Sequence, residues 1–328
     1  MVCFTKDLSD EGDADCALEM RNGVQRFYTD WGGRTGGEAP VKLKCIYYLY
    51  LFIIFAINII ITRYISIMSK IAPSQLAKIN THPRDEHITF DEGPHIYTVH
   101  GKLGYTSVTT WNHHHFEKFD ADAIINSMVR GKKMKDPTYK YYGMTKAQIK
   151  ADWDTNRDCA ASAGTNMHYD IECFYNGMTI VNDSIEYKYF QNFERDHSDL
   201  KPFRTEWIVY YEEYKISGSI DMVFELPNGD LLIYDWKRCK EITYDSNFGK
   251  AAITPCIKHL PDTNFWHYAL QLNMYKTILE HKYGKKVVGL FLVCLHPDNP
   301  GKNYEKIMVP FLEKEMADLL EVRLQELA

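Results

Sequence analysis

The stretch from Ile216 to Lys240 limits the fold of this chain most strongly, because it predicts a β-hairpin with a fixed register. Two runs rich in Ile, Val, Leu, Phe, Tyr and Trp flank the turn Pro227-Asn228-Gly229, as the strands of a hairpin require. Pro suits the first position of a three-residue loop, and Gly suits the left-handed position that closes it. Counting back from this turn along both strands puts Asp221 opposite Asp235.

Asp221, Asp235 and Lys237 then share one face of the hairpin. Two carboxylates that face each other on paired strands lie about 5 Å apart and repel. A divalent cation between them removes the repulsion, and oxygen ligands suit Mg²⁺ or Mn²⁺. Lys237 brings a positive charge to an anion or nucleophile bound there. The competing interpretation is a solvent-facing strand with ordinary charges, because this spacing alone is common.

Composition indicates a folded protein and restricts its class. The chain has 328 residues, of which 45% are hydrophobic and 14% aromatic, enough for a sizeable core in one large domain or two smaller ones. A net charge of -6 gives no overall nucleic-acid signature, so binding of a polyanion requires a local patch or metal ions. The eight cysteines include no C-x-x-C pair, which indicates reduced thiols in an intracellular compartment rather than a zinc ribbon or clustered iron–sulfur motif.

The first 67 residues differ from the rest of the chain. Residues 1–44 are polar, acidic and then glycine-bearing, which predicts a poorly ordered segment. Residues 45–67 are hydrophobic, and the uncharged part, 45–62, is long enough to span a bilayer as a helix and associate the protein with a membrane. The alternative is that Met68 is the true start and the preceding residues are a non-native extension.

A folded-domain pattern starts at Asp85 and leads to a long helical pattern over residues 145–175, expected in two pieces and ended by Asn176-Gly177. His168 and Glu172 lie one turn apart on its second piece. A His and a Glu at this spacing can ligate one metal ion, or one can orient the other. The competing interpretation is a surface hydrogen bond between them.

Two further elements carry candidate site residues. A strand over residues 204–211 contains Glu206, and a helix that ends at Gly284 presents Gln271 and Tyr275 on one face. An amide and a phenol can contact a ligand there, whereas the competing interpretation is a tyrosine half in the core. A buried strand over 287–295, another over 307–309 and a closing helix from Glu313 complete the chain.

Four short motifs occur in a fixed order, and together they resemble the PD-(D/E)XK nuclease superfamily. The order is GT-x-x-H-x-x-x-E, then G-x-I-D, then D-W-K, then Q-x-x-x-Y. It is similar to the RecB-like exonuclease branch, which includes mitochondrial genome maintenance exonucleases and nucleases of large DNA viruses. The resemblance implies an α/β restriction-endonuclease-like core over residues 85–328, with a mixed central β-sheet flanked by helices and a helical N-terminal elaboration.

The resemblance also implies roles for individual residues. The expected metal ligands are His168, Asp221, Asp235 and the carbonyl oxygen of Trp236. Lys237 would orient or deprotonate the attacking water. Gln271 and Tyr275 would contact DNA near the scissile phosphate, and Glu172 and Glu206 would support the site. Ile220 stands where the superfamily name has proline, and the cysteines do not match the four-cysteine cluster of some relatives.

The resulting expectation is a Mg²⁺- or Mn²⁺-dependent deoxyribonuclease, an exonuclease of DNA replication, repair or recombination. Its partner would be DNA, single-stranded or with free ends. Hydrolysis of a phosphodiester needs hydroxide near neutral pH and neutralisation of the phosphate charge, and Mg²⁺ supplies both. Two alternatives are a catalytically silent DNA-binding protein that retains the fold and a scaffold tethered to a membrane through residues 45–62.

Overall fold

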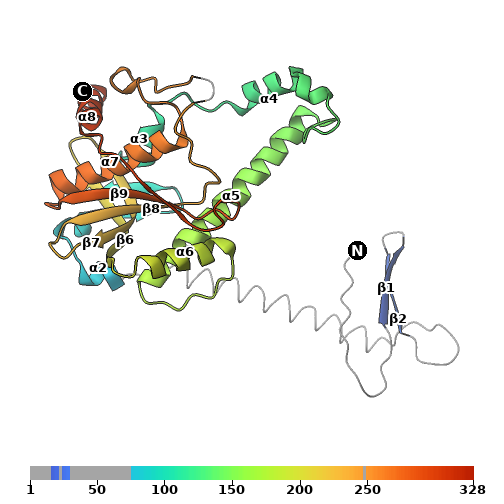
Figure 1. Cartoon of the computed structure of the whole chain (residues 1–328), viewed down its shortest axis with the longest axis horizontal. Coiled ribbons are helices and arrows are strands. Elements are labelled where there is room, and N and C mark those ends of the chain that lie inside the picture. Colours follow the sequence, from blue (N-terminus) through green and yellow to red (C-terminus); the bar gives the residue numbers. More distant parts are fainter. Residues whose placement is uncertain (1–15, 22–23, 30–74, 247–248) are drawn as a thin grey trace, which may run out of the picture. The chain divides into compact units, whose positions relative to one another are not determined.

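The computed structural model describes residues 16–21, 24–29, 75–246 and 249–328 (Figure 1). The chain divides into two compact units, residues 1–72 and 73–328. In the first unit the described residues form an antiparallel strand pair, β1 (Cys16–Arg21) and β2 (Val24–Thr29). This strand pair was not predicted from the sequence. The hydrophobic stretch 45–67 lies outside the described residues, and none of the described helices is long and apolar enough to cross a membrane.

The second unit contains a six-stranded mixed sheet. Its strands are β5 (Thr106–Ser107), β6 (Lys201–Tyr211), β7 (Ile216–Glu225), β8 (Leu231–Lys237), β9 (Val287–Cys294) and β10 (Glu305–Met308). The order is β10-β9-β8-β7-β5, and β6 also pairs with β7. The pairs β5–β7 and β8–β9 are parallel, whereas the other neighbours are antiparallel. A short antiparallel pair, β3 (Ile88–Asp91) and β4 (Ile96–Val99), forms a separate sheet.

The second unit also contains helices, most of which pack around the sheet. They are α2 (Gln75–Ile79), α3 (Val108–His113), α4 (Ala121–Arg130), α5 (Lys146–Tyr175), α6 (Ile185–Asp196), α7 (Asn264–Lys282) and α8 (Glu313–Leu327). Three short 3-10 helices are η1 (Pro83–His87), η2 (Lys132–Lys135) and η3 (Pro255–Ile257). This arrangement confirms the expected mixed central sheet flanked by helices.

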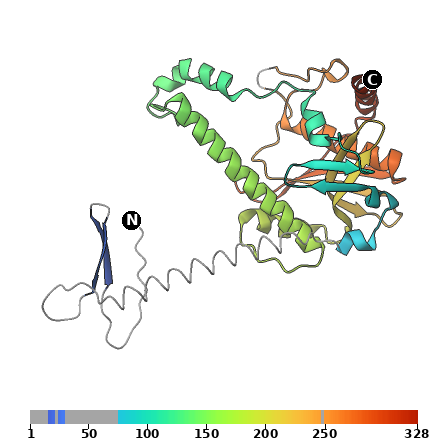
Figure 2. The same cartoon turned by 180° about the vertical axis from the view of Figure 1, so that it is seen from behind.

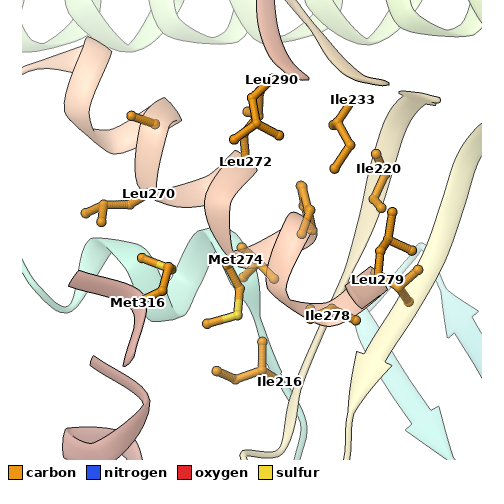
Figure 3. Packing of buried hydrophobic residues seen from close by; sticks show 14 of the residues in the cluster. Ile216, Ile220, Ile233, Leu270, Leu272, Met274, Ile278, Leu279, Leu290 and Met316 are labelled. Carbon is orange, nitrogen blue, oxygen red and sulfur yellow. The ribbon is translucent and has the colours of Figure 1, made fainter. Parts of the chain in front are cut away.

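Two hydrophobic clusters lie on opposite faces of the hairpin strands, as alternation along a strand requires. On one face, Ile233 and Leu290 pack against Leu272 and Ile278 of α7, as Figure 3 shows. On the other face, Tyr234 and its neighbours pack against α5 and α6, whose buried members include Ile171 and Phe190. The hairpin strands are therefore buried on both faces along their shared ladder, and Asp221 and Asp235 lie just beyond the last pair of that ladder.

The hairpin register predicted from the turn is confirmed. Leu226 and Asp230 face each other across the turn, with the Leu226 N–H donating to the Asp230 carbonyl at 2.9 Å. Gly229 has φ +84°, the left-handed conformation that the loop requires. Farther along, Met222 pairs with Tyr234 as the last pair of the ladder, and Asp221 and Asp235 are the next residues on their strands.

Two expectations about the earlier part of this unit are corrected. The helix α5 is one continuous helix rather than two pieces, and both views show it as a single rod with α4 beside its N-terminal end (Figures 1 and 2). The compact unit also includes α2, ahead of the expected start at Asp85. The Leu76 N–H of α2 donates to Asn176 Oδ1 at 2.9 Å, which joins α2 to the end of α5.

Candidate metal and catalytic site

The site lies where β7 and β8 separate. The recorded ladder between them ends at the pair Met222 and Tyr234, while the first residues of β7, Ile216 and Ser217, pair with β5. At the point of separation Asp221 accepts a hydrogen bond from the Trp236 backbone N–H through Oδ2, at 3.0 Å. A carboxylate thus takes a backbone donor at the end of the ladder, which fixes the orientation of its side chain.

His168, Glu206 and Asp221 form a cluster with the geometry of a metal site. One ligand atom from each lies within 4.8 Å of the other two. His168 Nδ1 is 3.4 Å from Asp221 Oδ2 and 4.0 Å from Glu206 Oε1. The residues come from α5, β6 and β7, so the fold assembles the cluster from distant segments. The His168 and Glu206 side chains are 29% and 36% exposed, and the cluster is therefore open to a substrate.

Glu206 reaches this cluster through an unusual backbone conformation. Its φ is +43°, in the left-handed region that side chains other than Gly, Asn and Asp seldom adopt. In the β6–β7 register, Thr205 pairs with Met222 and Trp207 with Ile220, which leaves Glu206 beside Asp221. The Ser219 hydroxyl donates to Glu206 Oε2 at 2.7 Å and holds the carboxylate in place. Such strain costs free energy and is concentrated in proteins at functional sites.

Asp235 and Lys237 form a second group at the end of β8. Lys237 Nζ lies 2.5 Å from Asp235 Oδ2, and the Asp235 side chain is 2% exposed. Gln271 of α7 donates from Nε2 to Asp235 Oδ1 at 3.3 Å. The ring of Tyr268, also on α7, faces the ammonium with its centroid 4.6 Å from Lys237 Nζ. The carboxylate and the ammonium are therefore both held from the side of α7.

The carboxylates of the site have raised pKa values because they are removed from water close to one another. Burial and, to a smaller extent, the charge of Asp221 raise the pKa of Glu206 to about 8. Burial raises the pKa of Asp235 to about 6, although the Lys237 charge opposes the rise. Burial also raises the pKa of Asp221. The raised pKa values make it harder for these acids to carry a negative charge, and a divalent ion would act in the opposite direction.

The two basic groups respond in opposite directions. Burial acts to lower the pKa of Lys237, but the charges of Asp235 and Asp221 outweigh it and raise the pKa above its ordinary value. Lys237 is consequently a permanent cation in this environment. Burial, reinforced by the Lys237 charge, lowers the pKa of His168 to about 4. The imidazole is thus neutral at physiological pH, the form that ligates metals.

The residues present fit Mg²⁺ or Mn²⁺. The donor set combines carboxylate oxygens with one neutral imidazole, which suits hard or borderline divalent ions better than soft ones. Glu206, Asp221 and His168 would hold the ion, whereas Asp235, an expected ligand, is not one of this group of three and pairs with Lys237. The backbone of Trp236, whose carbonyl is another expected ligand, acts to raise the pKa of His168, against the larger effect of burial.

The remaining predicted site residues lie beside or beneath the cluster. Glu172 is one helical turn after His168. Burial and, to a smaller extent, the charge of Glu92 raise the pKa of its carboxyl to about 7. Tyr275 is 3% exposed and packs on Gly218, where an added Cβ would lie 3.0 Å from the phenol oxygen. Gln271 is 9% exposed and bonds Asp235. Contact of Gln271 and Tyr275 with DNA stays a prediction, and the present hydrogen bond of Gln271 positions the Asp235 carboxylate.

Two contributing residues were not predicted from the sequence. Ser219 holds Glu206, and Tyr268 faces Lys237. Tyr268 precedes Gln271 by three residues on a helix, so spacing alone would have placed it on the same face. Ser219 precedes Asp221 by two residues on a strand, and alternation would likewise have placed it beside that carboxylate.

No family model matches the sequence, and no curated protein matches it. Among solved structures, a protein named "Putative exonuclease" from Eubacterium rectale is similar, with 12% sequence identity and a TM-score of 0.32. The match covers 68% of this chain and 78% of that one. The case for a function therefore rests on the geometry of the site itself.

Proposed function

We propose that this protein is a divalent-metal-dependent nuclease that hydrolyses phosphodiester bonds of DNA, acting as an exonuclease on single strands or free ends. The observation that carries the proposal is the cluster of His168, Glu206 and Asp221, whose ligand atoms lie within 4.8 Å of one another. Beside it, a permanently charged Lys237 is paired with Asp235. The motif order supports the finer assignment to a RecB-like exonuclease.

The chemistry of phosphodiester hydrolysis accounts for these residue types. Mg²⁺ or Mn²⁺, when bound, lowers the pKa of water and neutralises charge on the phosphate. His168, Glu206 and Asp221 would hold the ion, and the partial exposure of the His168 and Glu206 side chains gives a substrate access to this cluster. Lys237 donates a hydrogen bond where negative charge develops, because its raised pKa favours a donor over a base.

The neighbours of these residues keep the arrangement rigid before substrate binds. Gln271 fixes Asp235 from α7, and the Tyr268 ring limits where the Lys237 ammonium can move. The Trp236 N–H fixes Asp221, and the Ser219 hydroxyl fixes Glu206. Groups held in place in this way need little reorganisation during the reaction, which is the main source of electrostatic catalysis.

The test is cleavage of end-labelled DNA by the purified full-length protein. Single-stranded, double-stranded and covalently closed circular substrates are incubated with Mg²⁺, with Mn²⁺ or with a chelator. We expect metal-dependent release of short products from the labelled linear substrates and none from the circles. Lys237→Ala serves as the inactive control, because it keeps the ligand cluster. Equal cleavage with chelator, or by Lys237→Ala, would refute the proposal.

A further inference from the structure

Cys239 and Cys294 lie in direct contact next to the candidate site. Their Sγ atoms are 3.6 Å apart. Cys294 is the last residue of β9, whereas Cys239 follows the end of β8 by two residues. Five cysteines whose side chains the structure describes are free thiols, and among these five only Cys239 and Cys294 are hydrogen-bonded to each other. This contact therefore distinguishes the pair from the other cysteines.

The strand register ties this pair to Lys237. In the parallel β8–β9 ladder, Lys237 is the partner of Cys294. The Leu295 N–H then donates to the Lys237 carbonyl at 2.9 Å. The Lys237 charge also acts on the Cys239 thiol. The backbone that carries the Lys237 ammonium is thus paired directly with the segment that contains Cys294.

We propose that Cys239 and Cys294 form a reversible disulfide when the protein meets a peroxide, and that this bond slows the nuclease site. The second part rests on the proposed function. A disulfide requires the sulfurs to approach to about 2 Å, so they must move together by about 1.5 Å. Cys239 lies beyond the end of β8, outside the ladder, and can supply this movement. The movement pulls on the segment that begins at Lys237.

The reaction balances with a peroxide as the oxidant. The Cys239 sulfur attacks one peroxide oxygen, the O–O bond breaks, and a sulfenic acid and one molecule of water form. The Cys294 sulfur then attacks the Cys239 sulfur. An S–S bond forms, the S–O bond breaks, and hydroxide leaves and takes the Cys294 proton as a second molecule of water. Two thiols are oxidised by two electrons in total, one peroxide is reduced, and a dithiol reverses the change.

The environments of the two sulfurs indicate that Cys239 reacts first with the peroxide and Cys294 second. Cys239 is partly exposed and can meet the peroxide, whereas Cys294 is 2% exposed and can react only with its neighbour. The hydrogen bond shared with Cys294 and the Lys237 charge lower the pKa of Cys239, although burial opposes them. Thiolate character increases reactivity toward peroxide. Cys256 is also partly exposed, yet burial raises the pKa of its thiol, which makes it a matched control.

A peptide map of the full-length protein tests the disulfide directly. The protein is treated with hydrogen peroxide, the remaining thiols are alkylated, and the digest is analysed by mass spectrometry. We expect a cross-linked peptide pair joining Cys239 to Cys294, lighter by two hydrogens and released by dithiothreitol. Cys256→Ser should still give this pair, whereas Cys294→Ser should give a Cys239 sulfenic acid trapped by dimedone. Oxidation of exposed Cys159 without the cross-link would overturn the proposal.

A cleavage assay on the same samples tests the coupling to Lys237. Oxidation should reduce cleavage by the wild-type protein by about tenfold or more, because displacement of a catalytic group by about 1 Å costs this much. Dithiothreitol should restore the rate. An equal loss in Cys239→Ser and Cys294→Ser would overturn the coupling. The peptide map does not depend on DNA cleavage. Absence of nuclease activity would therefore refute the proposed function, whereas the map would still show whether the disulfide forms.

Discussion

Replacing Glu206 by Gln should stabilise the metal-free protein at alkaline pH while abolishing cleavage. Gln keeps the shape of the protonated acid and can still accept the Ser219 hydrogen bond. Burial and the Asp221 charge raise the pKa of Glu206 from 4.5 to about 8, which corresponds to a ceiling of about 5 kcal/mol. Since the side chain is 36% exposed, solvent screening reduces the expected gain to about 1–2 kcal/mol.

The pH dependence of this effect has a definite sign. A carboxyl whose pKa is raised on folding adds no penalty below its unfolded pKa of 4.5, where it is protonated in both states. At higher pH the unfolded chain loses this proton, whereas the folded protein must either retain it or bury a charge. The free energy of unfolding therefore falls as the pH rises through the folded pKa of about 8. Glu206→Gln removes this loss, so the two proteins should be equally stable in acid and diverge with increasing pH.

Urea unfolding of both proteins in chelator across this pH range measures the difference. Glu305→Gln is the matched control, since it removes one carboxylate from an exposed position in β10 and should change stability by less than about 0.5 kcal/mol. Mn²⁺ should stabilise the wild-type protein much more than Glu206→Gln. A variant less stable than wild type at alkaline pH would show that the Glu206 carboxylate is not under electrostatic stress.

Four further predictions concern the surrounding residues. Lys237→Ala should bind Mn²⁺ in calorimetry yet cleave DNA about 10²- to 10³-fold more slowly, as expected when a donor to developing charge is lost; near-normal cleavage would contradict this role. Tyr268→Leu should slow cleavage while Tyr268→Phe retains most of the rate, because the ring face holds the Lys237 ammonium; equal rates would contradict this. Tyr275→Phe should weaken cleavage with little change in melting temperature, because its phenol lies near Asp221 and Gln271; a large loss of stability with normal turnover would place it in the core alone. A protein starting at Met68 should remain soluble and active, because it keeps α2 and every site residue, and insolubility would contradict this.

Local chemistry explains why the sequence predicted the hairpin accurately. The register follows from Gly229 and the turn around it, and it required no knowledge of distant residues. The prediction that Asp221 faces Asp235 depended only on that turn. Helix ends were predicted for the same reason, since Thr145 and Gln148 form a capping box at the start of α5.

Features that depend on tertiary contacts were missed. The break expected in α5 does not occur, because the segment has no proline and an internal Gly164 costs only about 1 kcal/mol. The left-handed conformation of Glu206 and the insertion of β5 beside β7 both depend on residues far away in the sequence. These two features turn an ordinary hairpin into a site, because they bring Glu206 to Asp221 and separate β7 from β8.

The most direct test of the account is the anomalous diffraction signal of Mn²⁺ soaked into crystals of the protein. The account predicts a peak bounded by His168, Glu206 and Asp221, within coordination distance of a ligand atom from each. Asp221→Asn crystals soaked in the same way should show a much weaker peak or none. A strong peak elsewhere, with none at this cluster, would contradict the assignment of the metal and catalytic site.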